Sequence, residues 1–175
     1  MSAGKGTIGP PELLAAEHEL SAFTSREPAL DQWLKRRALK SQQSGAARTY
    51  VLATEKLRVI GYYSLVVGSV SRARAPGRVR RNMPDPVPIM LLARLAMDND
   101  WQGQGLGCGL LQDAVHRTIQ AADIAGIRAI LVHAISMEAK RFYQYFGFRP
   151  SEVEDMTLMA TLAELKQALS GSDRV

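Results

Sequence analysis

The sequence predicts an α/β fold, in which a central sheet carries helices on its faces. Strand-like segments rich in Val, Tyr and Ile come first, at residues 49–53 and 59–70, and they are close enough to pair as antiparallel neighbours. From residue 89 onward, apolar strands alternate with helical patterns, which is typical of a sheet covered by helices. The chain has 175 residues, of which 46% are hydrophobic, and this length predicts a single domain over residues 1–175.

The N-terminal part predicts a helix after a loosely patterned start. The first residues offer three leucines as core contributors: Leu13, Leu14 and Leu20. Pro28 is favourable at the first position of a helix, and Gly45 is a suitable stop. Between them, apolar side chains recur on one helical face, namely Leu30, Trp33, Leu34 and Ala38.

A strand and a long helix follow in the middle of the chain. Residues 89–97 are a mostly apolar run, as expected of a strand covered on both faces. Apolar side chains then keep helical spacing from Leu106 to Ala122. Gly126 is well placed to end this helix as its C-terminal cap.

The C-terminal part contains clear boundary signals. Residues 127–134 predict another buried strand, after which Ser136 can cap a helix that Gly147 closes. A last strand is expected at residues 156–159. It precedes Thr161-Leu-Ala-Glu164, a capping-box pattern that begins a C-terminal helix.

The net charge of +5 is concentrated in one arginine segment, defined here as residues 72–81. Its basic residues are Arg72, Arg74, Arg78, Arg80 and Arg81. Nearby prolines and Gly77 predict a loop, where binding residues often lie. Clustered basic charge favours a polyanionic partner, and a solvated loop that only aids solubility is the alternative.

Cysteine usage and hydropathy indicate the compartment. No apolar run approaches the roughly 18–20 residues needed to cross a bilayer, and the N-terminus lacks a signal pattern. The single cysteine, Cys108, cannot form an internal disulfide, which suits a reducing cytoplasm. We therefore expect a cytoplasmic protein with no membrane segment.

A glycine-rich stretch, Gln102-Gly-Gln-Gly105-Leu-Gly107, joins a predicted strand to a predicted helix. Free N–H groups and the positive end of the helix dipole make such a junction a receptor for phosphate. A P-loop requires Lys and then Ser or Thr after its last glycine, whereas Cys108 follows Gly107. The dinucleotide fingerprint Gly-x-Gly-x-x-Gly belongs to a first βαβ unit, and the glycines here lie late in the chain.

Two motifs resemble those of the GNAT superfamily of N-acetyltransferases. Gln102-x-x-Gly105-x-Gly107 resembles its acetyl-CoA signature, and Phe142-Tyr-Gln-Tyr-Phe-Gly-Phe148 resembles its Phe-Tyr-x-x-x-Gly-Phe helix end. The resemblance implies a GNAT fold, with a central mixed, mostly antiparallel sheet flanked by helices. It also implies acetyl-CoA as co-substrate.

Further stretches, over about residues 15 to 162, are similar to the GNAT-type toxins of bacterial toxin–antitoxin modules. They are Leu30-Asp-Gln-Trp-Leu34, Gly61-Tyr-Tyr-Ser-Leu65, Asn82-Met-Pro-Asp-Pro-Val-Pro88, Leu92-Ala-Arg-Leu-Ala96, Leu131-Val-His-Ala134 and Met156-Thr-Leu-Met159. Members of this branch acetylate the α-amine of aminoacyl-tRNA and stop translation. The resemblance implies that substrate, an antitoxin of the ribbon-helix-helix type and a homodimer. Phe23-Thr-Ser-Arg26 and Ser151-Glu152 depart from the branch's usual pattern.

The resemblance also assigns roles within the site. Tyr143 takes the place of the tyrosine that donates a proton to the leaving thiolate, although a core aromatic is the structural alternative. The cofactor-binding residues would be Leu95, Ala96, Met97, Gln102, Gly103, Gln104, Gly105, Leu106, Gly107 and Phe142. The arginine segment, with Lys35, Arg36 and Arg94, would hold tRNA phosphates. Arg94 falls in a predicted buried strand, so a structural ion pair is an equal alternative.

Other residues are expected to be structural. His18, His116 and His133 are widely separated, and no Cys or carboxylate joins them at metal-ligand spacing, so we expect no metal. Phe142 and Phe146 have the spacing of core anchors, and packing is the expected role of Tyr145.

Two alternative functions stay open. A GNAT enzyme that acetylates a polyamine, an antibiotic or a protein N-terminus is the nearest one, although a cationic amine would prefer an acidic pocket. A non-catalytic acyl-CoA sensor or nucleic-acid-binding module is the other. No helix-turn-helix or zinc-finger spacing supports direct DNA binding.

Overall fold

The computed structural model describes residues 7–172, so residues 1–6 and 173–175 of the predicted domain lie outside the described part. The described chain forms two compact units. The first contains the residues up to 66 together with 94–114, and the second contains 67–93 and the residues from 115 onward. Strands β3 (Val59–Val70) and β4 (Val87–Met97) and helix α4 (Leu106–Ala125) have residues in both units.

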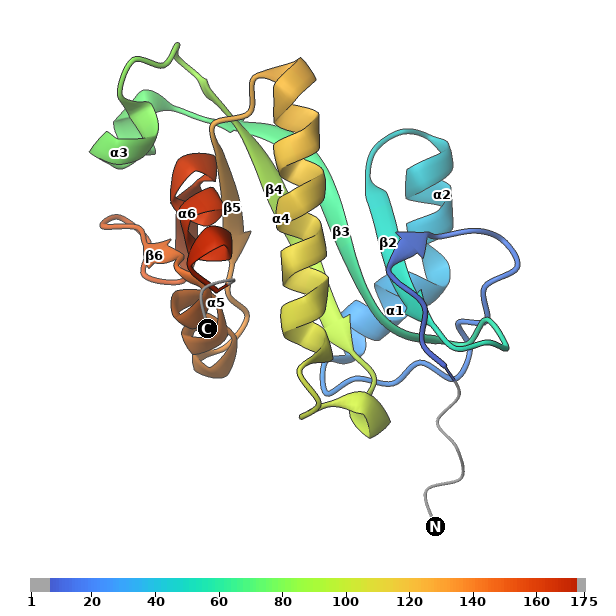
Figure 1. Cartoon of the computed structure of the whole chain (residues 1–175). Helices are drawn as coiled ribbons and strands as arrows, with labels where there is room; N and C mark the ends of the chain where they lie inside the picture. The colour runs from blue at the N-terminus through green and yellow to red at the C-terminus, as the bar shows by residue number, and fades with distance from the viewer. Residues whose placement is uncertain (1–6, 173–175) are drawn as a thin grey trace. The chain divides into compact units, whose positions relative to one another are not determined.

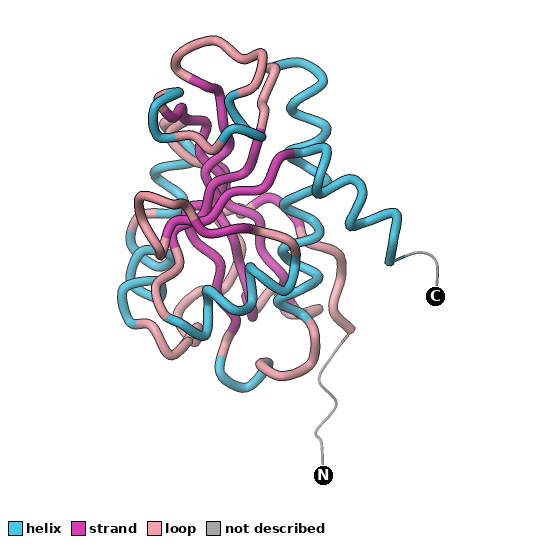
Figure 2. The backbone as a smooth tube through the Cα atoms, turned by 90° about the vertical axis from the view of Figure 1, so that its left-hand side faces the viewer, coloured by secondary structure: helices cyan, strands magenta, loops and turns pink. Residues whose placement is uncertain are grey.

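Seven strands form one sheet in the order β1-β2-β3-β4-β5-β7-β6. The other strands are β1 (Glu12–Leu13), β2 (Arg48–Ala53), β5 (Ala129–His133), β6 (Arg149–Pro150) and β7 (Thr157–Thr161). Pairs β1–β2, β2–β3, β5–β7 and β6–β7 are antiparallel, and β4–β5 is parallel over Ile89 to Leu92. The prediction of a mixed, mostly antiparallel sheet is confirmed. Figure 2 shows the strands in magenta.

The helical part of the first unit differs from the single helix predicted from the sequence. Pro28 does begin helix α1 (Pro28–Arg36), but the chain leaves the helical conformation at Arg37 and starts again as α2 (Ala38–Gln43). No Gly or Pro marks this break. Helix α2 contacts β2 (Figure 1), where the Gln42 amide donates to the Leu14 carbonyl at 2.6 Å and accepts from the Thr49 N–H at 3.0 Å. Long-range hydrogen bonds therefore accompany the change of direction.

The core of the first unit lies between α1, α2 and the sheet. Its buried members include Phe23, Leu34, Val51 and Tyr62. Leu14 is 2% exposed and belongs to this core, as predicted, and Leu20 packs against it. The prediction for Leu13 is wrong, because this side chain is 47% exposed. Successive residues of a strand point to opposite faces, so only one of the two adjacent leucines faces the core.

The helix boundaries of the second unit follow the sequence signals. Ser136 caps α5 (Met137–Phe146), because its hydroxyl accepts from the Ala139 N–H at 3.0 Å. Gly147 ends that helix with a φ of 115°. The predicted capping box begins α6 (Leu162–Ser172), with two reciprocal hydrogen bonds of 3.1 Å between Thr161 and Glu164. Helix α6 contacts β7.

The arginine segment is more ordered than the predicted loop. It contains a 3-10 turn at Arg72–Arg74, η1, and a short helix at Gly77–Arg80, α3. Ala75 and Val79 are buried in an apolar cluster with residues of β4, β5 and β7. These two small side chains between the arginines fix the segment to the sheet. No helix within residues 7–172 is long and apolar enough to span a membrane.

Candidate functional site

The predicted phosphate loop is a bend between β4 and α4 in the first unit. Gly103 has a φ of 76° and Gly105 a φ of 78°, in the left-handed region that side chains disfavour. A Cβ at either position would meet no atom within 4 Å, so backbone conformation, rather than lack of space, requires glycine. Residues 102–105 are exposed, and α4 begins directly afterwards. The first N–H groups of α4 have no partner within the helix, which makes them available to an anion.

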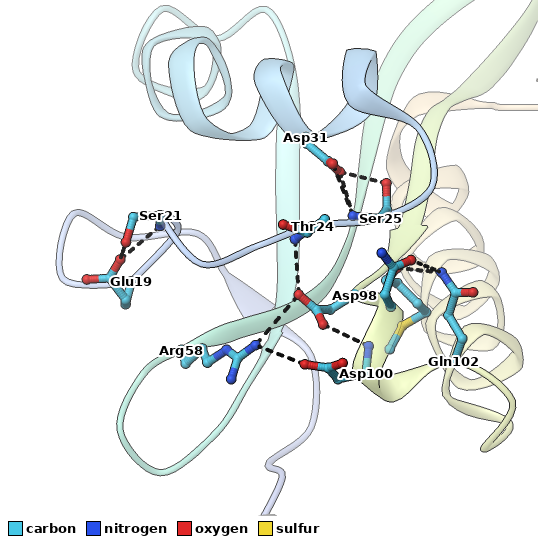
Figure 3. A network of polar contacts seen from close by, with 11 residues as sticks. Glu19, Ser21, Thr24, Ser25, Asp31, Arg58, Asp98, Asp100 and Gln102 are labelled. Carbon is cyan, nitrogen blue, oxygen red and sulfur yellow. Dashed lines mark hydrogen bonds and ion pairs between the residues drawn. The ribbon is translucent and has the colours of Figure 1, made fainter.

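The side chain of Gln102 fastens this bend to the end of β4. Its amide donates to the Met97 carbonyl at 3.1 Å and to the Asn99 side-chain oxygen at 3.3 Å (Figure 3). A short 3-10 turn, η2 (Asn99–Trp101), lies between these residues, and the Trp101 side chain anchors it in the core. The side chain of Gln102 therefore shapes the loop, and its main-chain N–H could bind a ligand.

A buried carboxylate next to the loop escaped the sequence analysis. Asp98 directly follows β4 and is 2% exposed. Its carboxylate accepts hydrogen bonds from the Thr24 and Asp100 N–H groups, both at 3.0 Å, and lies 3.8 Å from Arg58 Nη2 (Figure 3). Asp-x-Asp after a strand is a capping signal for a short turn, so the contact to Asp100 was accessible from the sequence. The contact to Thr24 spans 74 residues and could not be predicted from the sequence.

The strand segment expected to hold the pantetheine arm leads directly into this bend. Leu95 is half-buried, whereas Ala96 and Met97 are buried. Met97 is the last residue of β4, and the N–H of the next residue, Asp98, donates to the Ile60 carbonyl of β3 at 2.8 Å. The end of the segment is thereby fixed to a neighbouring strand.

Tyr143 lies in the second unit, in the middle of α5. It is 6% exposed, and its ring makes edge contacts with Phe142 and Phe148 at centroid distances of 5.2 and 5.8 Å. Burial raises the pKa of Tyr143 well above its ordinary value. The hydroxyl therefore remains protonated at neutral pH, as a proton donor must be.

The aromatic neighbours of Tyr143 do not all follow the prediction. Phe142 and Phe146 are half-buried. Tyr145 is 89% exposed, so the expectation that it packs in the core is wrong. Residues two apart on a helix point to different sides, and here one side is solvent.

The arginine segment contains one half-buried and four exposed arginine side chains. Arg72, Arg74, Arg80 and Arg81 are exposed. Arg78 turns inward, where it pairs with Glu164 at 2.9 Å and donates to the Met159 carbonyl at 2.9 Å. Arg128 also holds the segment, by donating to the Val79 and Arg78 carbonyls, both at 3.1 Å. The guanidinium of Arg78 is therefore engaged within the fold.

Three further basic residues proposed for tRNA lie in the first unit. Lys35 and Arg36 are exposed in the last turn of α1. Arg94, on β4, lies with its guanidinium carbon 3.8 Å from the centre of the Trp33 ring, which is itself stacked on Tyr62. The described residues thus give Arg94 a cation–π contact and not the ion pair weighed as its structural alternative. Partial burial lowers the pKa of Arg94, but an arginine stays charged at neutral pH.

The histidines have ordinary structural surroundings. His18 is buried beside Glu12, with 2.7 Å between His18 Nε2 and the carboxylate. His133 and Thr157 form a side-chain hydrogen bond of 2.9 Å, and His116 is exposed. Among the described residues, no three His, Cys, Asp or Glu side chains are grouped so that they could hold a metal ion.

Comparison with known proteins gives concordant matches. A family model described as an acetyltransferase (GNAT) domain matches residues 46–150. A tRNA-acetylating toxin of Mycobacterium tuberculosis is 47% identical over 156 residues, which cover 89% of this chain and 93% of that protein.

Two solved structures resemble the fold over nearly its whole length. One is AtaT complexed with acetyl-methionyl-tRNAfMet, with a TM-score of 0.85 and 27% identity, covering 93% of this chain and 99% of that one. The other is a tyrosine-to-phenylalanine mutant of the AtaT toxin bound to the C-terminus of the antitoxin AtaR and acetyl-CoA. Its TM-score is 0.80 at 26% identity, and the match covers 94% of this chain and 99% of that one.

Proposed function

Because the chain belongs to the GNAT acetyltransferase family, we propose that it transfers acetyl from acetyl-CoA to the α-amine of aminoacyl-tRNA. In this function the protein is the toxin of a toxin–antitoxin pair and blocks translation. The observation that carries the proposal is the 47% identity to a tRNA-acetylating toxin over 89% of the chain. The exposed arginines support the same substrate, because basic groups attract a polyanion and repel a small cationic amine.

The glycine bend is the proposed grip on acetyl-CoA. N–H groups of residues 103–107 and the start of α4 would bind the pyrophosphate, and Leu95, Ala96 and Met97 would bind the pantetheine arm. Two features of the described residues fit this ligand. The glycine φ angles open the bend to an anion, and Gln102 keeps its own amide turned inward.

The chemistry requires a neutral amine and a stabilised leaving group. The amine of an aminoacyl ester is no harder to deprotonate than an ordinary α-amino group, whose pKa is about 8, so a useful fraction is neutral at pH 7 without a strong protein base. Its nitrogen attacks the thioester carbon, the C–S bond breaks, and the amine proton passes to solvent. Tyr143 is the proposed donor to the departing thiolate, and solvent returns its proton afterwards. A main-chain N–H of Leu95 to Met97 would polarise the carbonyl.

The outward arginines are the proposed contacts to tRNA phosphates. Arg74 and Arg80 line one open cavity of about 150 Å³ together with Ser151 and Glu152. Arg72 and Arg81 are exposed in the same segment. Lys35, Arg36 and Arg94 provide basic groups on α1 and β4. Arg78 belongs to this set only by sequence position, because its charge is already paired with Glu164.

The proposal extends to partners and compartment. AtaT, one structural neighbour, has been solved with the C-terminus of its antitoxin AtaR, which supports an antitoxin for this chain. We assign that antitoxin to the ribbon-helix-helix type, and we assign the toxin a homodimeric state. Charged tRNA and acetyl-CoA occur together in the cytoplasm, so the toxin would act there.

One experiment decides between this function and its alternatives. The protein is incubated with labelled acetyl-CoA and total charged tRNA, and labelled tRNA is then sequenced. We expect label on aminoacyl-tRNA and none on the same tRNA after deacylation. Label transferred instead to polyamines or protein N-termini would support the small-amine alternative. Acetyl-CoA binding without transfer to any acceptor would support the non-catalytic one.

A further inference from the structure

Asp98 is a buried charged group that the proposed chemistry does not use. Its side chain is 3% exposed, and it lies between the last residue of β4 and the phosphate loop. A carboxylate beside an anion-binding bend is electrostatically unfavourable, because it repels the phosphates that the bend must bind. Its presence therefore calls for a structural reason specific to this position.

The two oxygens of Asp98 hold different parts of the chain. Oδ1 accepts from the Asp100 N–H at 3.0 Å, within the turn that leads to Gln102. Oδ2 accepts from the Thr24 N–H at 3.0 Å and faces Arg58 Nη2 at 3.8 Å. In Figure 3 the carboxylate lies between the segment carrying Thr24 and the loop carrying Asp100. One side chain thus joins the bend to a segment distant in sequence.

Main-chain bonds reinforce the same junction. The Asn99 N–H donates to the Thr24 carbonyl at 2.8 Å, so Thr24 exchanges a donor and an acceptor with residues 98 and 99. The Trp101 N–H donates back to the Asp98 carbonyl at 2.9 Å. The entry to the phosphate loop is therefore fixed before any ligand binds.

The segment that receives Asp98 is itself held by a second buried carboxylate. Asp31, on α1, is 8% exposed and accepts from the Ser25 N–H at 3.0 Å and from the Ser25 hydroxyl at 2.6 Å. Thr24 and Ser25 thus bind two carboxylates with adjacent N–H groups (Figure 3). Asp98 consequently attaches the loop to an anchored part of the fold.

We propose that Asp98 is a positioning residue for acetyl-CoA, which aims the amides of the phosphate loop through its bonds to Thr24 and Asp100. The inference rests on the proposed use of acetyl-CoA. Amides that are already oriented bind an anion without first ordering the loop, so loss of this support weakens binding of the pyrophosphate. Asp98 is buried and both its oxygens are engaged by main-chain N–H groups, so its effect should appear in donor affinity more than in turnover.

The test compares Asp98→Asn with Asp100→Asn. Asparagine keeps one acceptor oxygen but presents an NH₂ group to the other N–H, so one of the two hydrogen bonds is removed. We expect the KM for acetyl-CoA to rise about tenfold to a hundredfold, as for a hydrogen bond to a charged group, with a smaller change in kcat. Asp100→Asn removes the same charge from an exposed side chain 3.9 Å from the same arginine, and its KM should stay unchanged.

A truncated donor separates positioning from general instability. S-acetyl-pantetheine lacks the pyrophosphate, so the wild-type protein should have a lower kcat/KM for it than for acetyl-CoA. The ratio of these two kcat/KM values should be smaller in Asp98→Asn than in the wild-type protein. If Asp98→Asn lowered kcat/KM by the same factor with both donors, Asp98 would only stabilise the fold, and the inference would be overturned. An undiminished preference for acetyl-CoA would overturn it too. If wild-type protein showed no preference between donors, the proposed phosphate grip itself would fail.

A milder variant covers the case in which Asp98→Asn does not fold. Arg58→Gln leaves both hydrogen bonds of Asp98 in place and removes only the partly exposed cation. It should lower the preference for acetyl-CoA over S-acetyl-pantetheine, measured as the ratio of their kcat/KM values, by about 1.5- to fivefold, the scale of an exposed ion pair. A donor preference identical to that of wild-type protein in a folded Arg58→Gln protein would contradict the proposed arrangement.

Discussion

Tyr143 and Tyr145 are two residues apart on α5, and their surroundings are opposite. Tyr143 is 6% exposed between two phenylalanines, whereas Tyr145 is 89% exposed. The same contrast separates Arg78, which is paired with Glu164, from the exposed Arg80. Such pairs provide variants that are matched in chemistry and differ in environment.

The first prediction concerns the proton donor. Tyr143→Phe should lower kcat by about 10²- to 10⁴-fold, the usual contribution of a positioned general acid. Affinity for acetyl-CoA, measured by calorimetry, should change little, because the ring and its packing remain. Tyr145→Phe is the control and should keep full turnover. A fully active Tyr143→Phe protein would show that another group, or none, protonates the thiolate.

The second prediction is a pH profile. Ordinary tyrosines have a pKa of about 10. Burial raises the pKa of Tyr143 above that value, so its hydroxyl stays protonated up to and beyond the pH at which an ordinary tyrosine begins to ionise. The rate should therefore rise with pH as the substrate amine loses its proton, near its pKa of about 8, and should not fall again before about pH 10. A descending limb centred near pH 7, absent in Tyr143→Phe, would contradict this assignment.

The third prediction separates Arg78 from Arg80. Arg78→Ala removes a half-buried ion pair and a hydrogen bond to the Met159 carbonyl, and we expect it to lower the free energy of unfolding by about 1–3 kcal/mol. Arg80→Ala should leave stability within about 0.5 kcal/mol and weaken tRNA binding instead. Urea denaturation and tRNA binding, measured on both proteins, test this division. If Arg78→Ala had the stability of the wild-type protein but bound tRNA more weakly, Arg78 would be a tRNA contact and this division would be wrong.

At the level of elements, capping chemistry decides where the helices of the second unit begin and end. Ser136 and Gly147 bound α5, and the Thr161–Glu164 box begins α6. These signals involve residues within three positions of each other, so they could be predicted from the sequence. Strand β3 has the predicted bounds, Val59–Val70, because Val, Ile, Leu and Tyr make up most of its length.

Elements that depend on distant partners could not be predicted in this way. The break at Arg37 accompanies hydrogen bonds from Gln42 to Leu14 and Thr49, and no local residue signals it. Helical turns in the arginine segment depend on the burial of Ala75 and Val79 against other strands. In the candidate site, the glycine bend and Tyr143 were identified by motif, whereas the hydrogen bond between Asp98 and Thr24 depends on tertiary structure.

The fourth prediction belongs to α5, the element that carries Tyr143. Ser136→Ala removes the hydroxyl that accepts from the Ala139 N–H and should destabilise the protein by about 1 kcal/mol. Ser136→Asp restores a good cap and should recover that loss. Ser170→Ala, at an exposed serine, serves as the control for serine removal. Equal unfolding midpoints for Ser136→Ala and Ser170→Ala would show that the cap contributes nothing.

For the whole molecule, the net charge of +5 and its distribution predict strong dependence of tRNA binding on salt. Replacement of Arg72, Arg74, Arg80 and Arg81 by Ala should weaken binding and reduce the slope of log K against log salt by roughly 0.7–0.9 for each phosphate that is no longer neutralised. Titrations at several salt concentrations measure both quantities. Unchanged affinity and slope would remove this segment from the substrate surface.

The inward turn of Arg78 has a consequence for how such a protein can diverge. A descendant that adopts a different acceptor can lose its outward arginines one at a time, because their side chains are exposed and even the bond from Arg80 Nη1 to the Arg72 carbonyl, at 3.4 Å, lies at the surface. Arg78 is attached to Glu164 and to the backbone of β7, so its removal harms the fold whatever the acceptor. Among descendants with altered chemistry, this single position should therefore outlast its four basic neighbours.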